Sequence, residues 1–204
     1  MPLVTFEGIE GSGKSTQARR AAEWYRSGGR EVLLEREPGG TPIGARLREI
    51  LLDPASRSLD PFSELLLMEA DRRQHVAEVL EPALARGALV VCDRFNDATF
   101  AYQGGGRGLP ESIVAAIDGW AVRGLRPART LLFDCPVEVG LARAKRRDGD
   151  ATPRFEGEDR AFHERVRAAY LAIAARESAR VRVIDTTRPP DVVFGEVRRH
   201  LEGI

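Results

Sequence analysis

Two kinds of hydrophobic pattern alternate along the chain. Short apolar stretches rich in β-branched residues alternate with longer stretches in which apolar residues recur every three or four positions. The short stretches predict buried strands, and the longer ones predict amphipathic helices. We expect strands at Leu3–Phe6, Glu31–Leu34, Ala88–Cys92, Thr130–Asp134 and Val181–Asp185. We expect helices over residues 14–27, 41–52, 60–86, 110–123, 136–146, 158–178 and 189–201.

The order of these elements predicts a single α/β domain over residues 1–204. Strands separated by helices favour right-handed crossovers and a parallel sheet covered on both faces, so we predict three layers around a five-stranded parallel sheet. Gly28-Gly29 is typical of a helix end, and Asp60-Pro61 is typical of a capped helix start. Two interruptions of the pattern stand out, the glycine-rich segment 103–108 and the charge-rich segment 143–154.

Polar residues gather where the expected strands end. Four of the strands run into them, at Glu7, at Glu35-Arg36-Glu37, at Asp93-Arg94 and at Asp134. In open parallel sheets, ligands bind beyond the carboxyl ends of the strands. The sequence therefore predicts that the chemistry is concentrated along one edge of the sheet.

Charge and composition narrow the classes of protein. The chain has 31 basic and 31 acidic residues, which disfavours a protein that coats nucleic acid or an anionic membrane. No apolar run approaches the roughly 20 residues of a membrane span, and the first residues lack the basic start of a signal peptide. Cys92 and Cys135 both lie in or beside apolar runs, as buried thiols in a reducing compartment would. We expect a cytoplasmic protein with no nucleic-acid or membrane partner.

The first expected strand is followed by a phosphate-binding motif. Gly8-Ile9-Glu10-Gly11-Ser12-Gly13-Lys14-Ser15-Thr16 matches G-x-x-x-x-G-K-[ST], between a strand and a helix as the motif requires. Its glycines allow backbone N–H groups to approach phosphate oxygens, and the following helix adds its positive end. We expect Lys14 to bridge the β- and γ-phosphates of ATP and the Ser15 hydroxyl to bind Mg²⁺. The motif predicts the P-loop NTPase fold, and no N-K-x-D tetrapeptide for guanine is present.

A second set of cations indicates a phosphorylated acceptor. Transfer between two nucleotides must hold two mutually repelling phosphate groups in line, so positive charge is needed on both sides. The P-loop serves the donor. For the acceptor the sequence offers Arg36, Arg48, Arg72 and Arg94.

Three further motifs, at these spacings from the P-loop, make the chain resemble bacterial thymidylate kinase. They are Arg36–Pro42, Asp93–Phe95 and Ala101–Gly108, and the resemblance extends from about residue 3 to Asp185. It implies transfer of the γ-phosphoryl group of ATP to dTMP, giving dTDP and ADP, as a step of dTTP synthesis for DNA replication. It also implies Mg²⁺ as the cofactor and a homodimer.

The resemblance also implies roles for particular residues around the acceptor. Arg48 and Arg94, with Arg36 nearby, would hold the dTMP phosphate, and Asp93 would be the magnesium-linked carboxylate. Arg72, Thr99 and Gln103 would meet the polar edge of thymine. Tyr102 would lie against the deoxyribose and exclude a 2′-hydroxyl, and Glu10 would lie near the acceptor sugar and phosphate. Met68 stands where the family commonly stacks a Phe on the base, so we expect looser base selection.

The donor side resembles the subtype that supplies its cations from a mobile lid. No arginine lies inside the P-loop, and we expect a lid at about residues 143–156, because a kinase must exclude water from ATP. Arg143, Arg147 and Arg154 are its candidate cations, beside Lys145 and Arg146. Pro153-Arg154 replaces the commoner Asp-Arg of the family. Lys14, Glu10, Arg94 and Arg154 are therefore the expected catalytic residues.

Two alternative functions remain open at this point. One is a P-loop kinase for another nucleoside monophosphate or for a deoxynucleoside, although a nucleoside would leave the arginine cluster without an anion. The other is a module that senses ATP without catalysis, which would need neither lid arginines nor an acceptor pocket. His75, His163 and His200 lie at helical positions and are expected to be structural.

Overall fold

The computed structural model describes residues 2–148 and 153–204. Its centre is one parallel sheet with the strand order β2-β3-β1-β4-β5, which confirms the predicted five-stranded sheet. The strands are β1 (Leu3–Glu7), β2 (Val32–Arg36), β3 (Leu89–Asp93), β4 (Arg129–Asp134) and β5 (Val181–Asp185). β1 lies in the middle because the chain crosses first to one side of it and later to the other.

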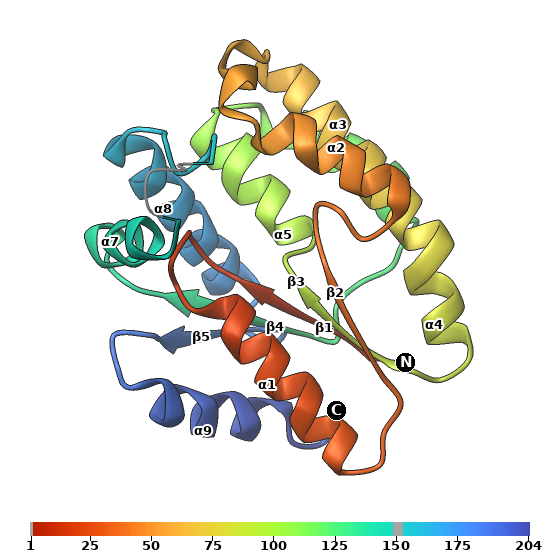
Figure 1. Ribbon diagram of the computed structural model, residues 1–204. Helices are drawn as coiled ribbons and strands as arrows, with labels where there is room; N and C mark the ends of the chain where they lie inside the picture. Colours follow the sequence, from red (N-terminus) through yellow and green to blue (C-terminus); the bar gives the residue numbers. More distant parts are fainter. Residues whose placement is uncertain (1, 149–152) are drawn as a thin grey trace.

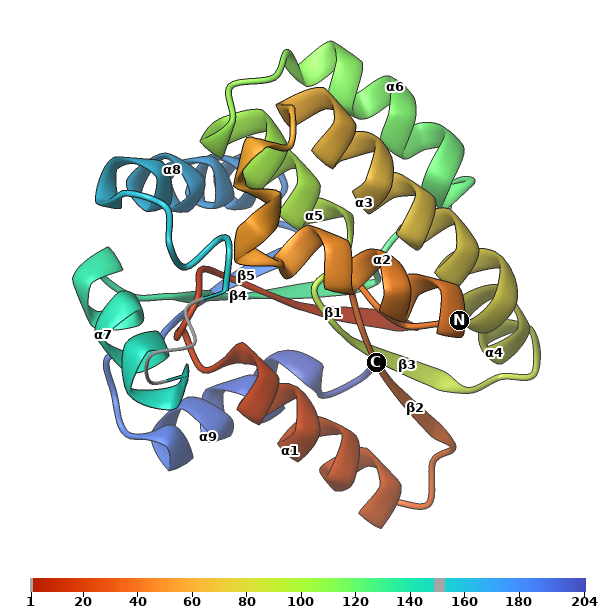
Figure 2. The ribbon, with the colours of Figure 1, turned by 45° about the horizontal axis from the view of Figure 1, so that its top comes forward.

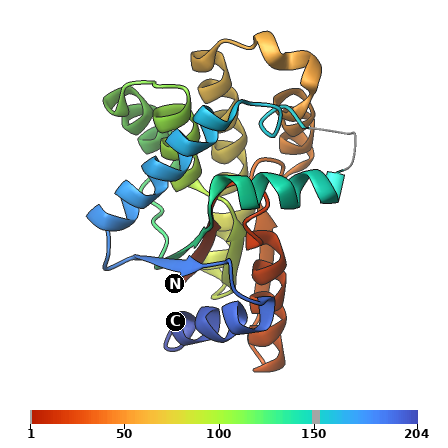
Figure 3. The same cartoon turned by 90° about the vertical axis from the view of Figure 1, so that its left-hand side faces the viewer.

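Helices cover both faces of the sheet and give three layers (Figures 1 and 2). The α-helices are α1 (Lys14–Ser27), α2 (Pro42–Leu52), α3 (Pro61–His75), α4 (Glu81–Ala85), α5 (Asn96–Thr99), α6 (Glu111–Val122), α7 (Val137–Asp148), α8 (Arg160–Arg176) and α9 (Pro190–Leu201). In the described part of the chain there are also a 3₁₀ turn, η1 (Pro54–Ser58), and two π-helical segments, η2 (Val76–Leu80) and η3 (Phe100–Gly106). α1 and α9 lie on one face, and α2, α3, α5, α6 and α8 lie on the other (Figure 2). α7 lies beside the carboxyl ends of the strands (Figure 3).

Local signals place several helix ends correctly. The Asp60 carboxylate accepts the N–H groups of Phe62 and Ser63 at the start of α3, as the Asp60-Pro61 signature predicts. Gly29 adopts a φ of 81° just after α1, where a left-handed residue ends the helix. The expected helix 60–86 is one continuous helical run, but η2 widens it just before Pro82. Proline has no N–H to donate, and this missing bond accounts for the π-helical turn.

The prediction that residues 103–108 interrupt the helical pattern is wrong for most of these residues. α5 and η3 form a helical segment that the pattern did not predict, and it ends only at Gly106. The glycines there serve close packing on α8: a Cβ on Gly105 would lie 2.5 Å from the Ala169 Cβ, and one on Gly106 would lie 2.6 Å from the Phe162 ring. A run of glycines usually predicts the end of a helix, whereas here it allows two helices to approach.

The charge-rich interruption also begins later than expected. α7 continues to Asp148, two residues beyond the expected helix 136–146, so Arg147 is helical as well as Arg143, Lys145 and Arg146. Residues 149–152 of the expected lid lie outside the described residues.

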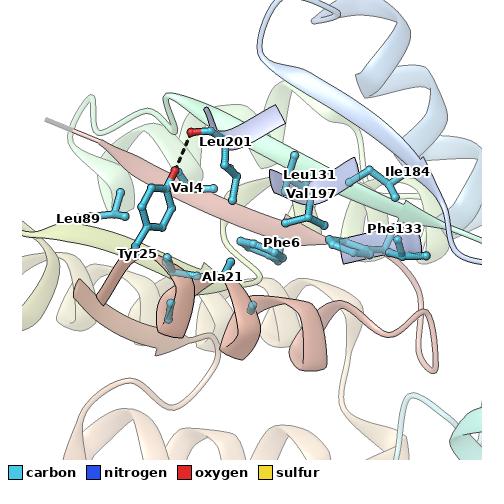
Figure 4. Packing of buried hydrophobic residues seen from close by; sticks show 14 residues of the cluster. Val4, Phe6, Ala21, Tyr25, Leu89, Leu131, Phe133, Ile184, Val197 and Leu201 are labelled. Carbon is cyan, nitrogen blue, oxygen red and sulfur yellow. Dashed lines mark hydrogen bonds between the residues drawn. The ribbon is translucent and has the colours of Figure 1, made fainter. Parts of the chain in front are cut away.

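The core fixes the sheet between its two helical layers. On the α1/α9 side it contains Phe6, Phe133, Tyr25 and Leu201, with the Phe6 and Phe133 rings stacked at 5.5 Å (Figure 4). The Tyr25 hydroxyl donates to the Leu201 carbonyl at 2.8 Å. On the other side an aromatic cluster joins η3 to α8, and it reaches the carboxyl edge of the sheet. No helix within residues 2–148 and 153–204 is long and apolar enough to cross a membrane.

Candidate active site

One cavity of about 620 Å³ opens at the carboxyl edge of the sheet, where the polar strand ends converge. The P-loop forms one part of its wall, and the motifs that follow β2 and β3 form another. Of the residues that the sequence singled out, the cavity is lined by Glu10, Gly11, Gly13, Lys14, Ser15, Thr16, Arg36, Arg48, Met68, Arg72, Asp93, Arg94, Thr99, Tyr102, Gln103, Arg143 and Arg147. The structure therefore brings the expected donor and acceptor residues to a single cavity.

The P-loop has a backbone that only glycine allows at its key positions. Gly8 and Gly11 have φ angles of 140° and 68°, and a Cβ on Gly11 would lie 2.0 Å from the Gly140 carbonyl oxygen. α1 begins at Lys14 and its cap residue Gly13 contributes no side chain, so the first N–H groups of the helix lack a side-chain partner at the cap. Such N–H groups and the positive end of the helix form an anion cradle.

Lys14 lies in this cradle and is almost fully buried. Its Nζ donates to the Ile9 carbonyl oxygen at 3.4 Å, which is a long contact that an arriving phosphate oxygen could replace. Burial and the neighbouring Arg94 charge lower the pKa of Lys14 to about 8. A phosphate group would favour the protonated form, because opposite charge raises the pKa of an ammonium group.

Three arginines face the cavity from the acceptor side. Arg48 donates from Nη1 to the Pro38 carbonyl oxygen at 2.7 Å, so a backbone carbonyl rather than a carboxylate orients this nitrogen. Burial, and beyond it the charges of Arg36 and Arg94, lower the pKa of Arg48. These three cations repel one another, and an anion placed among them would relieve that repulsion.

Arg94 is held from both ends. Its backbone has a φ of 72°, which is uncommon for a residue with a side chain. Its Nη2 donates to Glu10 Oε1 and to the Tyr102 hydroxyl, both at 3.0 Å, and Tyr102 donates to the same Glu10 oxygen at 2.6 Å. Burial alone would raise the pKa of Glu10, but the adjacent His163 ring and the Arg94 charge outweigh it and lower that pKa.

Arg72 is buried, at 3% exposure, and is tied on most of its edges. Nε donates to Glu37 at 2.8 Å, Nη1 to Glu69 at 2.6 Å and to the Thr99 hydroxyl at 2.7 Å, and Nη2 to the Phe95 carbonyl at 3.0 Å. A guanidinium has five N–H donors, so one remains for a ligand in the cavity. Burial raises the pKa of Glu69 to about 7 in spite of the Arg72 charge.

The expected lid residues separate into two groups. Arg143 and Arg147 line the cavity, together with Pro153, Phe155 and Glu156. Arg154 is not among the lining residues. It is 2% exposed, and its Nη1 lies 2.6 Å from Glu64 Oε2, with the guanidinium over the Phe155 ring. Its expected role at the donor phosphates therefore stays a prediction, and it requires Arg154 to leave Glu64.

The residues expected to bind Mg²⁺ are compatible with that ion. Ser15 and Asp93 both line the cavity, and Asp93 Oδ1 is buried without a hydrogen-bond partner. Mg²⁺ prefers oxygen ligands and is commonly held by one or two side chains with substrate phosphates, which suits this pair. Within the described residues, no group of three or more His, Cys, Asp or Glu side chains could hold a metal ion.

Sequence reasoning missed several residues around the cavity. The sequence predicts only a structural role for His163 of α8 and no contact with the P-loop, and in the structure its Nδ1 lies 3.5 Å from Glu10 Oε2. Tyr170, seven residues later on α8, donates to Glu7 Oε2 at 2.8 Å and accepts from Arg94 Nη1 at 3.1 Å. The one available signal was Glu7 itself, an acidic residue at the end of an apolar strand.

Comparison with known proteins gives a consistent result. A family model described as thymidylate kinase matches residues 6–197. The thymidylate kinase of Pseudomonas fluorescens (strain SBW25) is 53% identical over 187 residues, which are 92% of this chain and 88% of that one. The thymidylate kinase of Trichlorobacter lovleyi is 50% identical over 199 residues, which are 96% and 94% of the two chains. A crystal structure of thymidylate kinase from Ehrlichia chaffeensis superposes with a TM-score of 0.79 at 33% identity, covering 98% of each chain.

Proposed function

The chain belongs to the thymidylate kinase family, and we propose that it transfers the γ-phosphoryl group of ATP to dTMP, giving dTDP and ADP. The observation that carries this proposal is the presence of two cationic regions in one cavity, the P-loop with Lys14 and the arginines Arg36, Arg48 and Arg94. Two phosphate groups that repel each other need this arrangement before they can react in line.

The donor half follows from the P-loop. Its backbone N–H groups and the start of α1 would cradle the phosphates of ATP, with Lys14 between the β- and γ-phosphates. An oxygen of the acceptor phosphate attacks the γ-phosphorus, the new P–O bond forms as the bond to the bridging oxygen breaks, and ADP keeps that electron pair. Lys14, placed at these oxygens, would stabilise the charge that develops on them.

The acceptor half uses the side chains opposite the P-loop. Arg48, Arg94 and Arg36 would hold the dTMP phosphate. Arg72, Thr99 and Gln103 would meet the polar edge of thymine, with Met68 against the ring. Tyr102 would lie against the deoxyribose, and Glu10, fixed by Tyr102 and Arg94, would keep both of them aimed at the acceptor.

Ser15 and Asp93 would hold Mg²⁺ beside the phosphates. When bound there, the ion neutralises part of the charge on the transferred group and orients it. We also propose that residues 143–156 act as a lid, supported by the position of Arg143 and Arg147 in the cavity wall.

A homodimer and a cytoplasmic location belong to the same proposal. α2, α3 and α6 lie in one layer and carry the exposed apolar residues Ile43, Ile50, Phe62, Leu66, Ile113 and Trp120. Trp120 is 84% exposed, which suits a residue that a second copy would cover. Sedimentation velocity tests this: we expect a dimer that Trp120→Asp dissociates, and a monomeric wild type would refute it. The buried, free Cys92 and Cys135 support a reducing compartment.

The activity is tested by an ADP-release assay with Mg²⁺, ATP and a panel of acceptors. We expect the highest kcat/KM with dTMP, above dCMP, dGMP and AMP, and no turnover of thymidine. A higher kcat/KM for another monophosphate would mean that this monophosphate, and not dTMP, is the preferred substrate. Turnover of thymidine would favour a deoxynucleoside kinase. Tight ATP binding without turnover of any acceptor would favour the sensing module.

A further inference from the structure

The environment of Arg94 on its buried side is not explained by substrate binding alone. Glu7, at the end of β1, is fully buried and accepts two hydrogen bonds that both lead to Arg94. Its Oε1 accepts the N–H of Phe95, the next residue along the chain, at 2.7 Å. Its Oε2 accepts the Tyr170 hydroxyl at 2.8 Å, and that hydroxyl accepts Nη1 of Arg94 at 3.1 Å.

One carboxyl group, whose pKa burial raises to about 8, therefore holds both the backbone and the guanidinium of Arg94. The bond to the Phe95 N–H fixes the chain directly after the left-handed Arg94, a conformation that persists only where the surroundings hold it. The bond through Tyr170 fixes the far end of the side chain. Burial keeps the pKa of Tyr170 well above its usual value, so the hydroxyl retains the proton that it donates to Glu7.

Tyr170 also packs against the other tyrosine that holds Arg94. The rings of Tyr102 and Tyr170 meet edge to face at 6.2 Å, and the guanidinium lies 4.8 Å over the Tyr102 ring. Three N–H groups of Arg94 are used by Tyr170, Glu10 and Tyr102, so two of its five donors are left for a ligand. The direction of those two donors is set by the three bonds that are already made.

We propose that Tyr170 is a positioning residue, which acts with Glu7 to aim the free N–H groups of Arg94 at the phosphate of the acceptor. The inference rests on the proposed function, because it takes Arg94 to be a ligand of the dTMP phosphate. Tyr170 does not line the cavity and so acts through Arg94 rather than on the substrate.

Tyr170→Phe removes one hydroxyl and keeps the ring that packs on Tyr102. We expect kcat/KM for dTMP to fall about 10-fold or more, since a hydrogen bond to a charged group contributes about that factor or more. The KM for ATP stays unchanged, because the P-loop does not depend on this contact. Glu7→Gln keeps the shape of the side chain but only one acceptor oxygen, so it can accept from the Phe95 N–H or from the Tyr170 hydroxyl but not from both. It therefore lowers kcat/KM for dTMP in the same direction.

A matched control separates positioning from stability. Tyr25 is also a buried tyrosine with one hydroxyl bond, to the Leu201 carbonyl on the other face of the sheet (Figure 4). Tyr25→Phe is expected to lower the melting temperature without any change in kcat/KM for dTMP. An equal loss of kcat/KM in both variants would show that Tyr170 acts only through stability, and would overturn the inference.

A double-mutant cycle with Arg94→Ala separates this inference from the proposed function. If Tyr170 acts through Arg94, Tyr170→Phe causes no further loss in the Arg94→Ala background. The inference is overturned if the further loss persists there, or if Tyr170→Phe retains wild-type kcat/KM while Arg94→Ala does not. If Arg94→Ala itself leaves kcat/KM for dTMP unchanged, the role of Arg94 in the proposed function fails, and this inference fails with it.

Discussion

Glu64 is a buried carboxylate that holds together three parts of the chain, and its removal gives a sharp test of the structure. It lies in the first turn of α3 with 0% exposure. It accepts Gln103 Nε2 at 2.8 Å and Arg107 Nε at 3.2 Å, and its Oε2 lies 2.6 Å from Nη1 of Arg154. Gln103 and Arg154 are the expected thymine ligand and lid cation, so one side chain joins the base pocket to the segment after residue 152.

The two partners of the Glu64–Arg154 pair should differ strongly in their effect on stability. Glu64→Ala leaves the guanidinium of Arg154 buried beside no carboxylate at that position. An uncompensated buried charge of this kind costs about 3–5 kcal/mol of unfolding free energy. Arg154→Ala leaves Glu64 with Gln103 and Arg107, so we expect a smaller cost of about 1–2 kcal/mol from the lost bond and from packing on Phe155.

Urea unfolding followed by circular dichroism measures both costs, provided that the slope against urea concentration stays constant between variants. Glu64→Gln is the matched variant, because it keeps the shape and one acceptor oxygen and should lie between wild type and Glu64→Ala. Equal costs for Glu64→Ala and Arg154→Ala, or a cost of Glu64→Ala below about 1 kcal/mol, the range of surface ion pairs, would refute the reasoning.

Further predictions concern the donor site, the sugar, the lid and pH. Lys14→Ala should melt normally but lose about 3–4 kcal/mol of transition-state stabilisation, and a kcat near wild type would count against its role. Tyr102→Ala should lower the preference for dTMP over its ribose analogue by up to about 10²-fold, mainly because the variant gains activity on the ribonucleotide. An unchanged ratio of the two kcat/KM values would mean that ribose is excluded elsewhere in the site. Arg154→Ala should lower kcat far more than it weakens dTMP binding. If calorimetry shows a large loss of dTMP affinity while kcat is kept, Arg154 belongs to the acceptor site. Burial alone would lower the pKa of His75, but its contacts with Glu35 and Glu37 outweigh burial and raise that pKa to about 9. The protonated ring therefore stabilises the folded state by on the order of 3 kcal/mol below pH 6.5, and this contribution is lost as the pH rises through 9. His75→Gln should flatten the dependence of the unfolding free energy on pH in this range, and an unchanged slope would rule out His75 as its cause.

Much of the fold could be predicted because its signals are local. The alternation of apolar strands and amphipathic helices gave the parallel sheet, and the cap at Asp60 gave the start of α3. The helical segment that ends at Gly106 could not be predicted in the same way. Its glycines are needed because Ala169 and Phe162 lie against them, and this contact between η3 and α8 exists only in the folded chain.

The residues of the candidate site differ in the same way: some carry a local sequence signal, and others are placed only by packing in the folded chain. Lys14, Arg36, Asp93 and Arg94 lie at or shortly after the carboxyl ends of strands, and parallel strands bring these ends to one edge, so the sequence alone could group them. Tyr170 and Glu64 carry no such signal. A tyrosine or a glutamate on an amphipathic helix is read as core or as solvent-facing, and only the packing of α8 and α3 brings these two to buried arginines.

The partners of each arginine fit the proposed division of the cavity between a neutral base and a charged phosphate. Arg72 is paired with Glu37 and Glu69, which cancel its charge while leaving it one N–H. A guanidinium neutralised in this way is suited to a hydrogen bond with an uncharged carbonyl group, such as a base oxygen. Arg48 instead donates to the Pro38 carbonyl, a contact that orients the side chain without neutralising it. Arg48 therefore keeps its charge for an anion, and the choice of partner, carboxylate or backbone carbonyl, agrees with the proposed roles of Arg72 at the base and Arg48 at the phosphate.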